Sequence, residues 1–180
     1  ENKKITLSDI SINYVEKLKS NFPNNEILNI DLVHEDFDSR YKNIFGTFDF
    51  IFSLNVIEHI EDDKKAIENI YKLLKKGGCV FILVPAYKLL FNNFDVALEH
   101  YRRYNKQNLR QLFPQFKLLK SFYFNFVGIF GWFIVGKLVG KKIIPESNMK
   151  LYNLLVPAFK IIDKIIFNKV GLSVIQIAQK

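Results

Sequence analysis

The hydrophobic pattern of residues 48–85 predicts a strand, a helix and a second strand. Phe48 to Leu54 is a short apolar run rich in aromatic residues, which is typical of a strand buried on both faces. Glu61 to Lys75 then shows helical spacing, with acidic residues at its start and lysines at its end, as the helix dipole favours. We expect Gly77-Gly78 to end this helix and Cys79 to Val84 to form the second strand. A helix of this length returns the second strand parallel to the first, so the stretch predicts a βαβ unit of an open α/β sheet.

The rest of the chain continues the alternation of strands and helices. We expect the last strand to pair antiparallel with the strand before it, at the edge of the sheet. The most apolar piece, Phe126 to Val139, is shorter than the roughly 20 apolar residues that a membrane-spanning helix needs. The pattern predicts strands over 4–8, 27–33, 116–124 and 170–178, and helices over 12–22, 105–112 and 151–167.

Composition and charge narrow the class of protein. The 180 residues are 49% hydrophobic, which is enough to bury a core within one domain. The formal net charge is +8, but the lysines are spread along the chain and no nucleic-acid-binding motif occurs, so we expect no nucleic-acid partner. The single cysteine, Cys79, excludes a disulfide framework and favours a reducing compartment. The first residues do not resemble a signal peptide, so we expect a cytoplasmic protein.

Polar side chains follow the predicted strands, at the edge of the sheet where ligands bind in open α/β folds. Asp9 follows the first strand, and a carboxylate there can accept hydrogen bonds from both hydroxyls of a ribose. Asp36 follows the next strand and can accept from an exocyclic amine such as that of adenine, with Phe37 beside the ring. Either aspartate could instead cap a helix or stabilise a turn. Together with Asn55 they favour a nucleoside pocket.

Residues 4–116 resemble the class I S-adenosylmethionine-dependent methyltransferases that act on small molecules. The resemblance is carried by Asp9-Ile10, by Asp36-Phe37, and by FDFIFSLNVIEHI followed by LLKKGGCVFILVP. The later segment LEHYRRYNKQNLRQLF is similar to the substrate side of this family. The resemblance implies a Rossmann-like, mostly parallel sheet with an antiparallel last strand. It also implies S-adenosyl-L-methionine as cofactor and methyl transfer to a small-molecule substrate. The hydrophobic C-terminal third of the chain favours an acceptor that is sugar-linked or lipid-like.

The same resemblance assigns roles to individual residues. It implies that Asp9 binds the ribose, that Ile10 flanks the adenine, and that Asp36 meets the adenine amine with Phe37 beside it. Asn55 and Val56 would line the cofactor.

One part of the family pattern does not occur in this sequence. The family's first strand and its glycine-rich loop should precede Asp9, and no such loop is found in the 180 residues. We therefore expect residues 1–180 to be one methyltransferase-like domain that is incomplete at its N-terminus, the missing part lying upstream or coming from a partner chain. We also expect this chain alone to bind S-adenosylmethionine poorly.

Two histidines are candidates for acid–base chemistry. Methyl transfer from a sulfonium depends mostly on positioning, but an oxygen nucleophile can need a base. His100 is the best-placed candidate and His59 the next; either could instead make a structural hydrogen bond. The sequence predicts no metal ligands and leaves the oligomeric state open.

The segment 126–142 ends in lysines, which gives it two interpretations. It could lie on an anionic membrane surface, with its rings at the acyl boundary, or it could cover the substrate pocket with Trp132 packed against the domain. Residues 125–168 would then form a helical insertion.

Two other functions compete with methyl transfer. A nicotinamide-dependent oxidoreductase would also place an acid after a strand, although its glycine fingerprint does not occur here. A non-catalytic, methyltransferase-like binding module is the other alternative.

Overall fold

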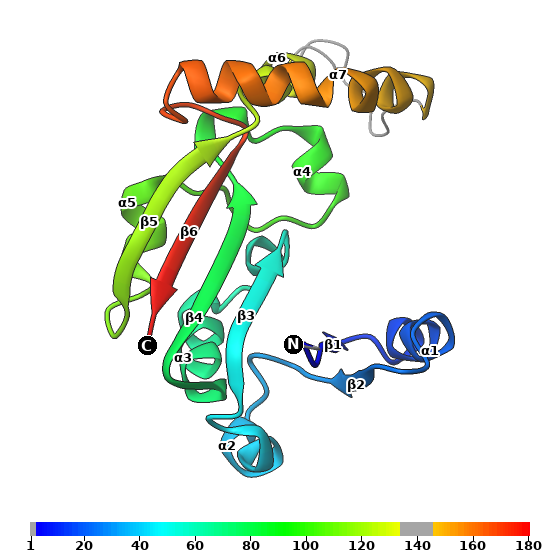
Figure 1. The fold of residues 1–180 in the computed structure, drawn as a ribbon, viewed down its shortest axis with the longest axis vertical. Coiled ribbons are helices and arrows are strands. Elements are labelled where there is room, and N and C mark those ends of the chain that lie inside the picture. Colours follow the sequence, from blue (N-terminus) through cyan, green and yellow to red (C-terminus); the bar gives the residue numbers. More distant parts are fainter. Residues whose placement is uncertain (1–2, 134–145) are drawn as a thin grey trace. The chain divides into compact units, whose positions relative to one another are not determined.

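The computed structural model describes residues 3–133 and 146–180, which form two compact units, residues 1–43 and residues 44–180. Figure 1 shows the helices and strands of both units. The prediction of a single domain therefore stays a prediction.

The first unit contains two short parallel strands and two helices. Strand β1 (Thr6–Asp9) pairs in parallel with β2 (Glu26–Asn29), with helix α1 (Ile12–Asn21) between them in the chain and α2 (Phe37–Arg40) after them. The βαβ order arises because α1 provides the crossover that parallel strands require. This agrees with the order expected from the sequence.

The second unit is built on a four-stranded sheet. Its strands are β3 (Phe48–Leu54), β4 (Leu74–Pro85), β5 (Lys117–Phe124) and β6 (Ser173–Gln179), in the order β3-β4-β6-β5. β3 and β4 are parallel, whereas β6 runs antiparallel to both β4 and β5. The predicted fold, Rossmann-like with an antiparallel last strand, is therefore confirmed. The prediction that the last strand lies at the edge is wrong, because β6 is inserted between β4 and β5 and leaves β5 outermost.

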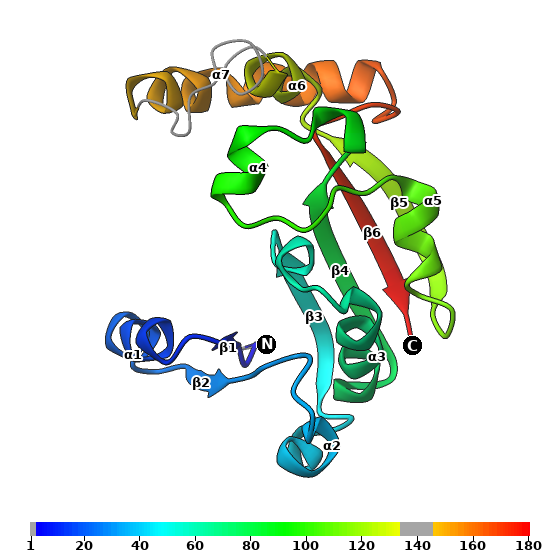
Figure 2. The same ribbon diagram turned by 180° about the vertical axis from the view of Figure 1, so that it is seen from behind.

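Helices cover one face of this sheet. α3 (Asp63–Leu73) and α5 (Lys106–Gln111) lie on the same face, and their side chains Ile67, Ile70 and Leu109 are buried with Val80 and Ile82 of β4 (Figures 1 and 2). α3 begins as its composition predicts, since Asp62 caps it by accepting a hydrogen bond from the backbone N–H of Lys65 at 2.9 Å.

The helix α3 ends earlier than the sequence predicted. It stops at Leu73, and Leu74 already pairs with Phe48 in β4. The pair Gly77-Gly78 therefore lies within the strand, at an irregularity of the β3–β4 register, and does not end the helix. Gly77 does have the left-handed φ of +80° that the pattern called for, and a Cβ on Gly78 would lie only 3.0–3.2 Å from three backbone carbonyl oxygens.

The prediction that β3 is buried on both faces is wrong for this unit. Ser53 lies on the face covered by helices and is buried, whereas Phe50, Phe52 and Leu54 on the opposite face are half-exposed. Successive side chains of a strand point to opposite faces of the sheet, and α3 and α5 cover the face opposite to these three side chains, so alternate side chains of β3 meet solvent.

Two helices lie beyond the carboxyl end of the sheet. These helices are α6 (Phe126–Trp132) and α7 (Glu146–Ile165). The buried Asp163 of α7 accepts hydrogen bonds at the start of α6, from the N–H groups of Asn125 and Phe126, both at 2.8 Å. These helices are the described part of the predicted insertion 125–168 (Figure 1). Lysines 137, 141 and 142 lie outside the described residues. Within the part of the chain that the structure describes, no helix has the length and apolar character that crossing a membrane would require.

Candidate functional site

The site lies where the carboxyl ends of β3 and β4 meet, within the second unit. Asn55 follows β3 in a left-handed turn with φ +52°, and its N–H donates to the carbonyl of Leu83 at the end of β4. The chain then makes a short 3₁₀ helix, Ile57–His59, which carries Glu58 and His59 side by side in sequence. The short helix α4 (Asn93–Ala97) and the loop after it bring Asp95 and His100 to the same place.

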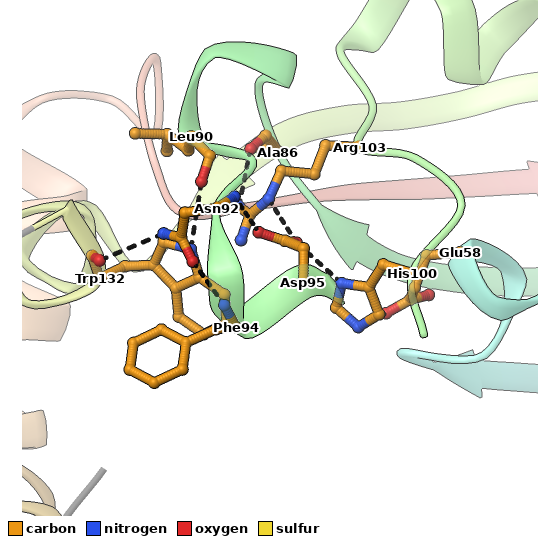
Figure 3. Close-up of polar contacts among 9 residues, drawn as sticks. All are labelled: Glu58, Ala86, Leu90, Asn92, Phe94, Asp95, His100, Arg103 and Trp132. Atoms are coloured by element: carbon orange, nitrogen blue, oxygen red, sulfur yellow. Dashed lines mark hydrogen bonds and ion pairs between the residues drawn. The ribbon is translucent and has the colours of Figure 1, made fainter. Parts of the chain in front are cut away.

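Asp95 is the centre of a buried network. Its Oδ1 accepts from Arg103 Nε at 2.7 Å and lies 2.8 Å from His100 Nδ1, while Oδ2 accepts from the N–H of Asn92 (Figure 3). These partners outweigh the cost of burial, so the pKa of Asp95 is lowered and the carboxylate stays ionised. An ionised Asp95 is an acceptor, so His100 carries its proton on Nδ1 and presents the lone pair of Nε2 on the other side of the ring.

Arg103 is held as firmly as its acidic partner. Its side chain is buried, and it donates to the carbonyl of Ala86 as well as to Asp95. The guanidinium also lies over the ring of Trp132, 4.7 Å from the ring centroid. Trp132 in turn donates from its indole N–H to the carbonyl of Leu90 (Figure 3).

Glu58 faces His100 from the opposite side of the ring. It is fully buried, and its Oε1 lies 4.0 Å from His100 Nε2, too far for a hydrogen bond. Its own backbone N–H is close enough to affect the carboxyl, but neither carboxylate oxygen has a partner of hydrogen-bond geometry among the described residues. Burial, only partly opposed by that N–H and by the charges of His100 and Arg103, raises its pKa to about 7.

His59 completes the group on its solvent side. Its ring lies edge-on to that of His100, with the centroids 4.7 Å apart. Burial and the neighbouring His100 lower its pKa, while the backbone carbonyls of Glu99 and Leu98 act in the opposite direction. We call Glu58, His59 and His100 the Glu–His–His cluster.

The structure thus brings both predicted histidines together and places them beside Asn55 and Val56. Val56 is exposed, and Asn55 precedes the helical turn that carries Glu58. The other predicted cofactor residues lie in the first unit.

In that first unit, Asp9 ends β1 and its Oδ1 accepts from the N–H of Ser11 at 2.8 Å, while Ile10 beside it is exposed. Asp36 is exposed, but Phe37 is buried against Tyr41, with 4.8 Å between ring centroids. Phe37 is therefore a core side chain in this unit. The cofactor contacts of all four residues stay predictions.

Three residues of the site, Glu58, Asp95 and Arg103, lie in stretches that the sequence marks as polar, but sequence reasoning gave none of them a role. Each is charged and buried, and such residues are rarely buried unless they are paired or functional. A usable signal was present: Asp95 stands next to the apolar Phe94 and Val96, and Glu58 lies between Ile57 and the candidate His59.

The sequence and the fold of this chain are similar to those of known methyltransferases. The model of the methyltransferase domain family matches residues 1–82. A S-adenosylmethionine-dependent methyltransferase from Archaeoglobus fulgidus superimposes with a TM-score of 0.55 at 14% identity, over 97% of this chain and 75% of its own. Residues 1–82 thus match the methyltransferase domain family, and the fold of the chain is that of S-adenosylmethionine-dependent methyltransferases. S-adenosyl-L-methionine, the cofactor expected from the sequence, is bound in one of the solved structures with this fold.

Two further methyltransferases of this kind share a name. Phosphoethanolamine N-methyltransferase 2 of Caenorhabditis elegans is 38% identical over 63 residues, which cover 29% of this chain and 14% of that protein. The enzyme of the same name from Haemonchus contortus, solved with S-adenosylmethionine, superimposes with a TM-score of 0.58 at 18% identity, over 98% of this chain and 43% of its own. This chain thus spans less than half the length of both proteins.

The residues present fit part of what this cofactor needs. Asp9 is half-buried at the end of β1, and its carboxylate can accept ribose hydroxyls as well as the N–H of Ser11. Asp95 and His100 can orient a proton acceptor, because one imidazole nitrogen is fixed by the carboxylate and the other is directed away from it.

Proposed function

We propose that this protein transfers the methyl group of S-adenosylmethionine to a small-molecule acceptor bound at the Glu–His–His cluster. The observation that carries the proposal is the pairing of His100 Nδ1 with the buried Asp95, which leaves His100 Nε2 as a proton acceptor at the carboxyl edge of the sheet. The class of the acceptor is supported by the names of the two nematode relatives, both phosphoethanolamine N-methyltransferases.

In this proposal the chain's own residues position the acceptor and manage its proton. When bound, S-adenosylmethionine would supply a methyl group on a sulfonium, which an acceptor oxygen or nitrogen can attack with S-adenosylhomocysteine as the leaving group. The acceptor loses one proton, which His100 Nε2 takes while Asp95 stabilises the resulting imidazolium. Asp9, Ile10, Asp36, Asn55 and Val56 would bind the cofactor, and Arg103 keeps Asp95 ionised.

Binding and turnover test the proposal separately. The natural protein is titrated by calorimetry with S-adenosylmethionine and, separately, with NAD. We expect it to bind S-adenosylmethionine and not NAD. Binding of NAD alone would instead favour the oxidoreductase, and binding of neither would favour a module that does not use these cofactors.

Transfer of labelled methyl groups to a panel of small amines and alcohols, phosphoethanolamine among them, then identifies the acceptor. Replacing His100 by Ala should lower kcat by roughly 10²–10⁴-fold with little change in cofactor affinity. The control is Glu68→Gln, which changes an exposed residue of α3 outside the cluster and should leave kcat unchanged. Equal kcat for both variants would exclude His100 as the base.

A further inference from the structure

Three potential metal ligands converge in the Glu–His–His cluster. Glu58, His59 and His100 each offer one ligand atom, and these atoms all lie within 4.8 Å of one another. Zinc–ligand bonds of about 2.1 Å place two ligands of a tetrahedral site roughly 3.4 Å apart. Side-chain movements of roughly 1 Å would therefore bring all three atoms to bonding distance.

His100 is already oriented as a metal ligand. Histidines that bind metals almost always donate their other ring N–H to a carboxylate or carbonyl, which fixes the tautomer and the ring plane. Asp95 supplies that carboxylate at 2.8 Å from His100 Nδ1, and Arg103 and the N–H of Asn92 hold it in place. The remaining nitrogen, Nε2, lies on the side of Glu58, 4.0 Å from its Oε1.

Glu58 supplies an independent indication of a missing partner. A fully buried carboxylate normally accepts several hydrogen bonds, because leaving its oxygens without partners is costly. Neither oxygen of Glu58 has such a partner among the described residues, and the carboxylate is directed toward His100 (Figure 3). A cation between Glu58 and His100 would satisfy it.

We propose that Glu58, His59 and His100 bind a divalent transition-metal ion, with Zn²⁺ the best match. Two imidazoles and one carboxylate form a ligand set of catalytic zinc sites, in which a fourth position stays open to water or substrate. His59 is exposed, so an ion can reach the cluster from solvent. The proposal goes beyond methyl transfer, because it holds whether or not an acceptor is methylated.

Metal binding and proton transfer compete for the same atom. His100 Nε2 cannot hold a metal and take a proton at once. In the metal-bound protein the ion itself would make a coordinated hydroxyl or amine of the acceptor more acidic. Metal affinity is therefore measured directly, and not through activity.

The experiment titrates the full-length, chelator-stripped protein with Zn²⁺ by calorimetry and with Co²⁺ by visible absorption. We expect one ion per chain, and d–d bands typical of a tetrahedral Co²⁺ site that Zn²⁺ displaces. Glu58→Gln and His100→Ala should each weaken binding at least 10-fold. Asp95→Asn, which keeps the shape of the positioning residue, should weaken it by roughly 10–100-fold.

The control His34→Ala removes a histidine outside the cluster and should bind both ions like the natural protein. Circular dichroism of every variant separates lost ligands from lost folding, and His59→Ala, at the exposed edge, keeps the test decisive if the buried variants unfold. Absence of a stoichiometric site, or unchanged Co²⁺ spectra in His59→Ala and Glu58→Gln, would overturn the proposal. Because neither titration contains S-adenosylmethionine, failure here leaves the methyl-transfer proposal standing.

Discussion

The metal-free protein should lose stability as the pH rises, and replacing Glu58 by Gln should reduce that loss. Burial raises the pKa of the folded-state carboxyl from 4.5 to about 7. Well below pH 4.5 the carboxyl is protonated in both the folded and the unfolded chain, so its ionisation does not affect stability there. Between pH 4.5 and about pH 7, Glu58 is ionised in the unfolded chain but still protonated in the folded one, so the free energy of unfolding falls as the pH rises.

The size of the effect follows from the two pKa values. Each pKa unit corresponds to about 1.4 kcal/mol, so the difference between 4.5 and about 7 amounts to about 3 kcal/mol, complete above pH 7. Glutamine in this place also buries a polar amide, which costs about 1–3 kcal/mol at every pH. The decisive quantity is therefore how the stability difference between the variant and the natural protein changes with pH.

The assay is urea unfolding in the presence of a chelator, followed by circular dichroism between pH 4.5 and pH 8. The natural protein should lose about 3 kcal/mol relative to Glu58→Gln over this range, with the steepest change between the two pKa values. Glu68→Gln is the matched control, because that glutamate of α3 is exposed. Parallel pH profiles for Glu58→Gln and the natural protein would refute the assignment of a buried, unpaired carboxyl.

Three further predictions concern other parts of the chain. Asp95→Ala leaves the buried Arg103 without its counter-ion and should cost about 3–5 kcal/mol of unfolding free energy, whereas a loss below about 1 kcal/mol would show that water replaces the carboxylate. Asp9→Ala should weaken binding of S-adenosylmethionine to the natural protein by about 1–3 kcal/mol in calorimetry, and an unchanged affinity with the fold intact would remove Asp9 from the site. Trp132, the only tryptophan, packs on Phe94 and Arg103, so its fluorescence should already be blue-shifted in buffer. A blue shift that occurs only on adding anionic vesicles would instead support the membrane interpretation of residues 126–142.

The sequence was sufficient where structure depends on neighbouring residues. The apolar run Phe48–Leu54 is strand β3 at the predicted bounds, and Asn105 caps α5 where the predicted helix begins. Hydrophobic spacing, caps and charged helix ends depend on residues a few positions apart, so they can be predicted from the sequence. The family motifs are local in the same way, and they predicted the match to the methyltransferase domain family.

The tertiary structure decided what depends on residues far apart in the chain. The place of β6 between β4 and β5 follows from pairing on both of its edges, which no local pattern records. In the same way, Asp95, which belongs to the N-terminal cap of α4, also pairs with His100 and Arg103. The carboxylate of Glu58 is buried without a hydrogen-bond partner among the described residues. The strength of a charge interaction depends on the solvent excluded around it, and that exclusion exists only once the strands, turns and loops of the fold have come together.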